Sequence, residues 1–233
     1  MKGYRIRKSV IDDSFVGNVD ISENTVDDEI NILNYFKCKD KNGIPVLDGE
    51  QMIEDWFPRK KGKKVFISHS HEDISAAKRL SLYLRQEKGW DCFIDSEVWG
   101  SCYKLIKKID DAYNRLSNEE NLYTYNGCQK TTSDIYLMLT TAINKVINTC
   151  PIFIFIESEN SVEDSTTYSP WIMEELNTYE LLRPKDEFVR KNVFVNDSAD
   201  SVIPNVEVSY KVDEILKRMV EIKNISDVDN LSL

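Results

Sequence analysis

The residues with the clearest chemical potential lie in the segment from Ser169 to Leu176, which carries a carboxylate beside an indole. Ser169 suits the N-cap of a helix, and Pro170 suits its first helical position. Trp171 and Glu175 are then four residues apart and lie next to each other on one strip of the helix. A carboxylate in such surroundings can line a cleft and have a shifted pKa. The segment therefore predicts a helix that presents Glu175 as a candidate catalytic group.

The helical period also predicts which way this helix faces. At about 100° per residue, the apolar side chains of Ile172, Leu176 and Tyr179 fall on one face, which should face the core. Glu175 borders that face and is expected at the rim of the buried side, whereas Glu174 should point towards water. The plain alternative is an ordinary surface helix, because Glu175 is one of 40 acidic residues in the chain. The rest of the sequence has to decide between the two.

The composition limits the classes of protein to consider. The chain has 233 residues, of which 41% are hydrophobic, enough for one buried core with appendages. Its formal net charge of −10 argues against a general nucleic-acid binder and against docking on anionic lipid. No apolar run approaches the roughly 18 residues of a membrane span. We therefore expect no nucleic-acid or membrane partner, and a small ligand held by local geometry.

The cysteines indicate the compartment. There are five, an odd number without a C-x-x-C pair. Cys92 and Cys150 lie in apolar, strand-like runs, where cysteine serves as a small core residue. This usage fits a reducing cytosol better than a secreted disulfide scaffold, so we expect a cytoplasmic protein.

The middle of the chain alternates between short apolar runs and segments with helical spacing. Three runs rich in β-branched and aromatic residues predict buried strands at residues 65–67, 92–94 and 152–156. Residues 74–84 and 135–146 carry apolar side chains at helical spacing, and the helix from Pro170 follows the third strand. This alternation predicts an α/β fold in which helices cover both faces of a parallel sheet.

The remaining segments define the expected domain organisation. Residues about 102–133 carry charges and tyrosines and interrupt the alternation, so we expect an insertion after the second strand. Residues 1–61 include an acidic stretch and run into basic residues, which favours an N-terminal extension and linker. The domain proper is then residues 62–223, and residues 224–233 form a C-terminal tail that frays.

Polar residues follow each of the three predicted strands. In parallel sheets of this kind, ligands collect at the carboxyl ends of the strands. Those ends are Ser68–His71, Asp95–Gly100 and the residues from Glu157 onward. The helix with Trp171 and Glu175 begins just after the third end. Three segments that are far apart in sequence should therefore converge on one edge, which favours a functional site.

At this point the motifs resemble a TIR (Toll/interleukin-1 receptor) domain. Val65–Asp73 is similar to the family's first strand and the loop after it. Cys92–Ser96, with Trp99, resembles the second strand and the loop often called BB. Ser169–Leu176 resembles the segment that carries the family's catalytic glutamate, four residues after the tryptophan. The resemblance covers roughly residues 62–220.

The resemblance implies a flavodoxin-like sheet and, as in many bacterial, plant and axonal members, cleavage of NAD. Thr131–Ile156, with Asn160–Ser161, further resembles a group of standalone bacterial members with the same insertion. Several bacterial members act in anti-phage defence by depleting NAD or by making cyclic ADP-ribose-type signals. The implied activity is NAD glycohydrolase or ADP-ribosyl cyclase, with NAD as substrate, no bound cofactor and no metal. The implied partners are other TIR domains, through self-association, and a downstream effector protein.

The residues of the motif suit this chemistry. The nicotinamide nitrogen of NAD already carries a positive charge, so the ring can leave without being protonated and one carboxylate is enough. Glu175 could hold the ribose and oppose the charge of an oxocarbenium-like transition state. Trp99 and Trp171 are candidates to sandwich the departing ring. For Trp171 a plain core position explains the residue equally well.

The other substrate-binding candidates come from the strand ends. Ser68, His69 and Ser70, with the amides of the next helix, could hold phosphate, because a helix N-terminus attracts anions. Capping and turn formation explain Ser70 slightly better than phosphate binding does. Asp95 either hydrogen-bonds the ligand or anchors the BB-like loop.

Two other readings of the sequence stay open. Many animal TIR domains only bind other TIR domains, so the fold alone does not settle activity. His69, His71 and Asp73 also spell H-x-H-x-D, the opening of a two-metal hydrolase motif, although a chain with 2 histidines is poor in imidazole ligands.

The BB-like loop carries an expectation about assembly. A cleft at one sheet edge of a small domain is shallow, and a ligand as long as NAD needs a second wall. We therefore expect activity to depend on self-association through the loop Glu97–Ser101, with Trp99 as an exposed interface anchor. The alternative is that Trp99 folds back onto its own domain.

Overall fold

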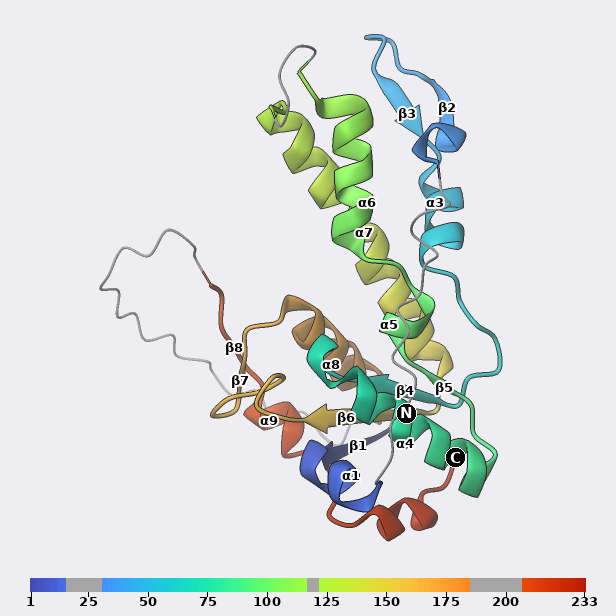
Figure 1. Ribbon diagram of the computed structural model, residues 1–233, viewed down its shortest axis with the longest axis vertical. Helices are drawn as coiled ribbons and strands as arrows, with labels where there is room; N and C mark the ends of the chain where they lie inside the picture. Colours follow the sequence, from blue (N-terminus) through green and yellow to red (C-terminus); the bar gives the residue numbers. More distant parts are fainter. Residues whose placement is uncertain (16–30, 117–121, 185–206) are drawn as a thin grey trace, which may run out of the picture.

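A five-stranded parallel sheet forms the centre of the protein, as seen in the computed structural model, which describes residues 1–15, 31–116, 122–184 and 207–233 (Figure 1). Every neighbouring pair of strands in this sheet is parallel. In order across the sheet the strands are β5 (Cys92–Phe93), β4 (Val65–Ser68), β6 (Ile152–Glu157), β1 (Lys2–Arg7) and β9 (Val220–Ile222). The three strands expected from the apolar runs are therefore confirmed, with β4 between the other two.

Side chains alternate between the two faces of this sheet, and helices cover both faces. Phe66 and Phe153 lie in one buried cluster with residues of α7, α8 and α9, whereas Ile67 and Ile154 lie in a second cluster with residues of α4, α1 and η4. The helical elements are α1 (Lys8–Ser14), α4 (Ile74–Lys88), α7 (Tyr125–Thr149), α8 (Pro170–Leu182), α9 (Asp213–Leu216) and the 3₁₀ turn η4 (Ile225–Asn230). The expectation of an α/β fold with helices on both faces is confirmed, and the arrangement is compatible with a flavodoxin-like fold.

The N-terminal strand overturns part of the expected domain organisation. Residues 1–61 were expected to lie outside the sheet, but β1 lies between β6 and β9 and pairs with both. Its segment KGYRIR buries only Tyr4 and Ile6, which is too weak an apolar pattern to stand out as a central strand. Arg5 links β1 to both neighbouring strands, since its guanidinium pairs with Glu157 of β6 at 3.0 Å and with Glu221 of β9 at 3.3 Å.

The C-terminal residues also belong to the folded body. Residues 224–233 were expected to fray, but they form η4, in which Val228 is fully buried in the cluster that includes α1 and α4. The ammonium of Lys2 donates hydrogen bonds to the hydroxyl and the carbonyl of Ser232. Both ends of the chain are therefore fixed beside each other.

The expected insertion and part of the N-terminal segment form one projection above the sheet (Figure 1). Within residues 102–133 lie α6 (Cys102–Ile109), η3 (Asp110–Asn114) and the start of α7, so helix α7 runs on through the expected end of the insertion. The apolar residues Met52 and Trp56 of α3 (Gly49–Trp56) share a buried cluster with Leu105 and Ile135. The remaining elements are η1 (Ile32–Tyr35), β2 (Phe36–Lys39), β3 (Pro45–Leu47), η2 (His71–Asp73), α5 (Asp95–Val98), β7 (Thr166–Thr167) and β8 (Tyr210–Lys211).

The buried cysteines fit the expected role of small core residues. Cys92 and Cys150 are buried, and burial raises the pKa of the Cys92 thiol to about 12 and that of the Cys150 thiol to about 11. Both thiols therefore stay protonated and unreactive at neutral pH.

Candidate functional site

The helix that carries the candidate glutamate begins as expected. Ser169 caps α8, because its hydroxyl accepts a hydrogen bond from the backbone N–H of Ile172 at 3.3 Å, and Pro170 occupies the first helical position. Ile172, Leu176 and Tyr179 are buried, which confirms the predicted core face. The local sequence is therefore sufficient to fix the start and the phase of this helix.

Glu175, however, lies deeper than expected. It was expected at the rim of the buried side, but only 3% of its surface is exposed. Its Oε2 accepts a hydrogen bond of 2.5 Å from the hydroxyl of Ser68, the last residue of β4. Helix α8 packs against α7 while Glu175 meets the end of β4, so the strip beside the apolar face is covered as well.

The surroundings of Glu175 favour its neutral form. Burial raises the pKa of this carboxyl well above its ordinary value, and the negative charge of Asp95 raises it further. The hydrogen bond from Ser68 acts in the opposite direction, and Glu174 adds a smaller repulsion. A buried carboxyl with a charged neighbour at the carboxyl edge of a parallel sheet is a candidate functional group.

His69 and Asp95 meet beside this carboxyl. His69 is buried, and its Nδ1 lies 3.2 Å from the carbonyl of Ile67 while its Nε2 lies 2.8 Å from the hydroxyl of Ser96. These partners fit a ring that carries its proton on Nδ1, an assignment that follows from the hydrogen bonds. One carboxylate oxygen of Asp95 lies 3.8 Å from the same Nδ1. The ends of β4 and β5 are thus joined through the imidazole.

The loops after β4 and β6 are tied together by Asp73, which the sequence offered only as part of the H-x-H-x-D and TIR-like motifs. Asp73 is fully buried, accepts a hydrogen bond from the amide of Asn160 at 3.0 Å and also binds the hydroxyl of Ser158. Ser70 precedes this turn, and its side chain makes no capping hydrogen bond. The signal for Asp73 was present in these motifs, but nothing in the sequence identified Ser158 as its partner.

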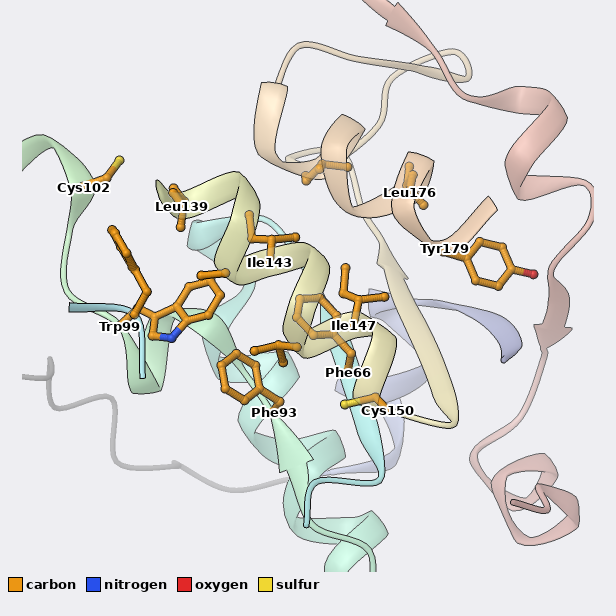
Figure 2. Close-up of a cluster of buried hydrophobic side chains, with 14 of the residues drawn as sticks. Phe66, Phe93, Trp99, Cys102, Leu139, Ile143, Ile147, Cys150, Leu176 and Tyr179 are labelled. Atoms are coloured by element: carbon orange, nitrogen blue, oxygen red, sulfur yellow. The ribbon is translucent and has the colours of Figure 1, made fainter. Parts of the chain in front are cut away.

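Trp99 does not line the site. Only 6% of its surface is exposed, and its ring packs edge-on against Phe57 and Phe93, with centroid distances of 5.7 Å and 5.2 Å. Its indole N–H donates to the carbonyl of Pro58 at 3.1 Å. Figure 2 shows the ring directed into the cluster of buried apolar side chains. The expectations that Trp99 binds substrate and is an exposed interface anchor are therefore wrong, because Phe57 and Pro58 draw it into the core.

Trp171 is only half-buried. Its ring meets the ring of Tyr136 from α7 edge-on, with centroids 5.0 Å apart and planes at 87°. The structure therefore brings together Ser68, His69, Asp95 and Glu175, leaves Trp171 partly accessible on the same helix, and removes Trp99 from the set.

Two hollows on the surface are lined by other residues. One, of about 700 Å³, follows the first turns of α7 from Tyr125 to Ser133. The other, of about 630 Å³, lies between α7 and α8 and includes Asn144, Asn177 and Glu174. Glu174 lines this second hollow and is half-buried, whereas it was expected to point towards water. Glu175 lines neither of these two hollows.

The described residues contain neither a metal-binding cluster nor a membrane-spanning helix. Within the described parts of the chain, no three His, Cys, Asp or Glu side chains are grouped so that they could hold a metal ion. His71 is exposed whereas His69 is buried. Across the same parts, no helix combines the length and the apolar character needed to cross a membrane.

Comparison with known proteins adds no further assignment. No family model, no curated protein and no solved structure matches the chain. The fold and the site define an α/β protein with a five-stranded parallel sheet and a buried glutamate at the carboxyl edge of that sheet.

Proposed function

We propose that this chain is a TIR-type NAD glycohydrolase or ADP-ribosyl cyclase, which releases nicotinamide and forms ADP-ribose or a cyclic ADP-ribose-type signal. The observation that carries the proposal is the pair Ser68–Glu175, where a carboxyl with a raised pKa meets the end of β4 beside Asp95. The sequence motifs around these residues resemble those of TIR domains. NAD is the substrate, and the reaction requires neither a bound cofactor nor a metal.

In the proposed reaction the bond between the ribose carbon and the nicotinamide nitrogen breaks. The electron pair of that bond goes to the ring, which becomes neutral and leaves without a proton. The Glu175 carboxylate opposes the positive charge that develops on the ribose. Water then adds to the sugar carbon to give ADP-ribose, or a nucleophilic atom of the same substrate adds to give a cyclic product, and in either case one proton is released to the solvent.

The carboxyl must be ionised and accessible for this chemistry. In this proposal its burial and its bond to Ser68 belong to a closed state, and the site opens when Glu175 separates from Ser68 and Asp95. A cationic nicotinamide ring next to Glu175 would favour the ionised form, because an opposite charge lowers a carboxyl pKa. We propose that self-association stabilises the open state, as part of a cytoplasmic anti-phage response in which a downstream effector protein reads the product. Trp99 is not an anchor in this proposal.

A second candidate function is a non-catalytic TIR scaffold that acts by assembly with other TIR domains. The observation that favours it is the burial of Glu175 with its hydrogen bond satisfied by Ser68, which is also what a purely structural glutamate would show. A scaffold does not require a charge at this position. The two candidates therefore differ in whether the ionised carboxylate matters.

The test is product analysis with purified protein. NAD is incubated with the wild type over a concentration series, with and without lysate from phage-infected cells, and products are identified by chromatography and mass spectrometry. The proposal expects nicotinamide, together with ADP-ribose or a cyclic isomer, and a specific activity that rises with protein concentration. If nicotinamide is never released while light scattering detects assembly, the scaffold is the correct function.

A further inference from the structure

The hydrogen bonds of His69 determine which of its ring nitrogens carries the proton. Nδ1 lies 3.2 Å from the carbonyl oxygen of Ile67, and a carbonyl oxygen only accepts, so Nδ1 carries the hydrogen. Nε2 of the neutral ring is then an acceptor. It lies 2.8 Å from the hydroxyl oxygen of Ser96, so this hydroxyl donates to the ring. Ser96 and His69 therefore have the arrangement of a nucleophile hydrogen-bonded to its general base.

A carboxylate supports this base from its other side. One carboxylate oxygen of Asp95 lies 3.8 Å from Nδ1 of His69, and the His69 ring is almost completely buried. A negative charge in this place stabilises the positive charge that the ring gains when it takes up a proton. Because both ring nitrogens have partners, the ring keeps Nε2 directed at Ser96.

Ser96 combines a partly accessible hydroxyl with a bond to a base. It lies in α5 and is half-buried, whereas Ser68 is fully buried. Ser133 of α7 is more exposed than Ser96, but its hydroxyl donates to the carbonyl of Gln129 at 2.8 Å. A carbonyl oxygen does not take up the proton of a hydroxyl at neutral pH. Ser133 is thus the exposed but unactivated counterpart of Ser96.

Both members of the pair directly follow residues that interact with the candidate catalytic carboxyl. His69 follows Ser68, whose hydroxyl donates to Glu175 at 2.5 Å. Ser96 follows Asp95, whose negative charge contributes to the raised pKa of Glu175. The nucleophile and its base therefore belong to the same strand ends as the proposed NAD site.

The charges at these strand ends favour one kind of electrophile. Attack on an ester or amide carbon creates a negatively charged oxygen, which the carboxylates of Asp95 and Glu175 would destabilise. A sugar carbon that loses nicotinamide carries positive charge instead, and the same carboxylates attract it. The surroundings of Ser96 therefore suit glycosyl transfer better than acyl transfer.

On the basis of the proposed function, we propose that Ser96 is a site of self-modification, whose hydroxyl competes with water for the ADP-ribosyl group of NAD. The bond between the ribose carbon and the nicotinamide nitrogen breaks, and its electron pair stays with the neutral ring. A bond forms between the same carbon and Oγ of Ser96, and the hydroxyl proton passes to Nε2 of His69. The imidazolium then releases this proton to the solvent. The products are nicotinamide and a chain with one ADP-ribosyl group on Ser96.

The test measures nicotinamide release and protein modification in the same samples. The full chain is incubated with NAD, nicotinamide is quantified by chromatography, and the modified residue is located by mass spectrometry of peptides. The expected result is a single ADP-ribosyl group on Ser96 that resists neutral hydroxylamine, which removes the group from aspartate and glutamate esters. Free ADP-ribose in place of NAD controls for glycation of lysines.

Three variants test the role of the pair. Ser96→Ala should lose the modification, whereas the matched control Ser133→Ala should keep it. His69→Gln retains an acceptor for the Ser96 hydroxyl but does not take up its proton. It should therefore slow the modification relative to nicotinamide release by about 10²- to 10⁴-fold. Circular dichroism checks that each variant is folded, and if His69→Gln is not, the comparison of Ser96 with Ser133 in the wild type decides.

The two readouts separate this inference from the proposed function. Nicotinamide release without modification of Ser96 overturns the inference and leaves the proposed function in place. Equal modification of Ser96 and Ser133, or an unchanged rate at Ser96 in folded His69→Gln, also overturns it, because exposure alone would then explain the reaction. If no nicotinamide is released, the proposed function fails and the inference fails with it.

Discussion

Replacing Glu175 by glutamine tests both the chemistry and the physical state of the site. The substitution keeps the shape of the side chain, and its carbonyl oxygen can still accept the hydrogen bond from Ser68. It removes only the ability to carry a negative charge. The expected result is therefore loss of NAD cleavage in a protein that is folded and is more stable than the wild type at neutral pH.

The loss of activity follows from the charge that the reaction needs. Removing one group that stabilises a transition-state charge typically lowers kcat by about 10²- to 10³-fold, or roughly 2.7–4 kcal/mol. The matched control is Glu174→Gln, since Glu174 lines the hollow between α7 and α8 and not the Ser68 pair. Release of nicotinamide is measured under identical conditions for both variants. Equal losses in the two variants would refute the assignment of the catalytic carboxylate.

The gain in stability follows from the raised pKa. Because burial and Asp95 raise the pKa of Glu175 in the folded state above its ordinary value of 4.5, the folded protein binds this proton more tightly than the unfolded chain. The wild type is then destabilised as the pH rises above 4.5, by about 1.4 kcal/mol for each unit of the difference in pKa. The cost disappears below the unfolded pKa, where both states are protonated. Glutamine carries no such cost at any pH.

Urea denaturation at neutral pH and below pH 4.5 measures this difference. Glu175→Gln should have the higher midpoint at neutral pH, with an unchanged m-value, and the advantage should shrink at the acidic pH. A variant that is less stable than the wild type by the same amount at both pH values would refute the reasoning, because the difference would then not depend on the ionisation of Glu175.

Three further predictions concern the strand, the carboxyl and the indole. An added Cβ at Gly3 would lie 2.1 Å from the ring of the buried Tyr179, so Gly3→Ala should lower the free energy of unfolding, measured in urea, by about 1–3 kcal/mol. Gly49→Ala is the control and should not lower it, because its Cβ would meet only the flexible end of a methionine at 3.2 Å. Equal stability of the two variants would contradict the central place of β1. As the pH is lowered, kcat/KM for NAD should begin to fall before the pH reaches 4.5, because Glu175 must be ionised to act and its pKa is raised. A pH profile that stays flat down to 4.5 would show that ionisation of Glu175 is not required. Trp99→Ala should lower the free energy of unfolding by about 3–5 kcal/mol in thermal or urea unfolding, since the substitution leaves a cavity in the core. If the variant had wild-type stability but impaired self-association, Trp99 would be an interface anchor after all.

The sequence by itself determined the elements whose signals are local. The apolar runs at Val65, Cys92 and Ile152 became β4, β5 and β6, and the cap at Ser169 began α8 as expected. Hydrophobic period and capping depend on residues within a few positions of each other, so they can be read from one chain. The convergence of the strand ends on one edge followed as well, since parallel strands align their carboxyl ends.

The central place of β1 could be decided only by the tertiary structure. The segment Lys2–Arg7 has two buried apolar side chains, and its partner strand β6 begins 150 residues later in the chain. What makes it a central strand is the pairing with β6 and β9, together with the ion pairs of Arg5. Such pairing depends on contacts across the whole chain, which a local pattern does not contain.

The burial of Glu175 was likewise decided by the tertiary structure. The helical period placed Glu175 beside the core face but gave no information on what covers the neighbouring strip, and that strip meets Ser68 at the end of β4. Trp99 presented the same ambiguity, and the side chain turned inward because Phe57 and the carbonyl of Pro58 receive it. A sequence period fixes the direction of a side chain relative to its own helix or strand. Whether that direction leads to water or to another part of the protein depends on which distant segments pack there, and only the folded chain brings those segments together.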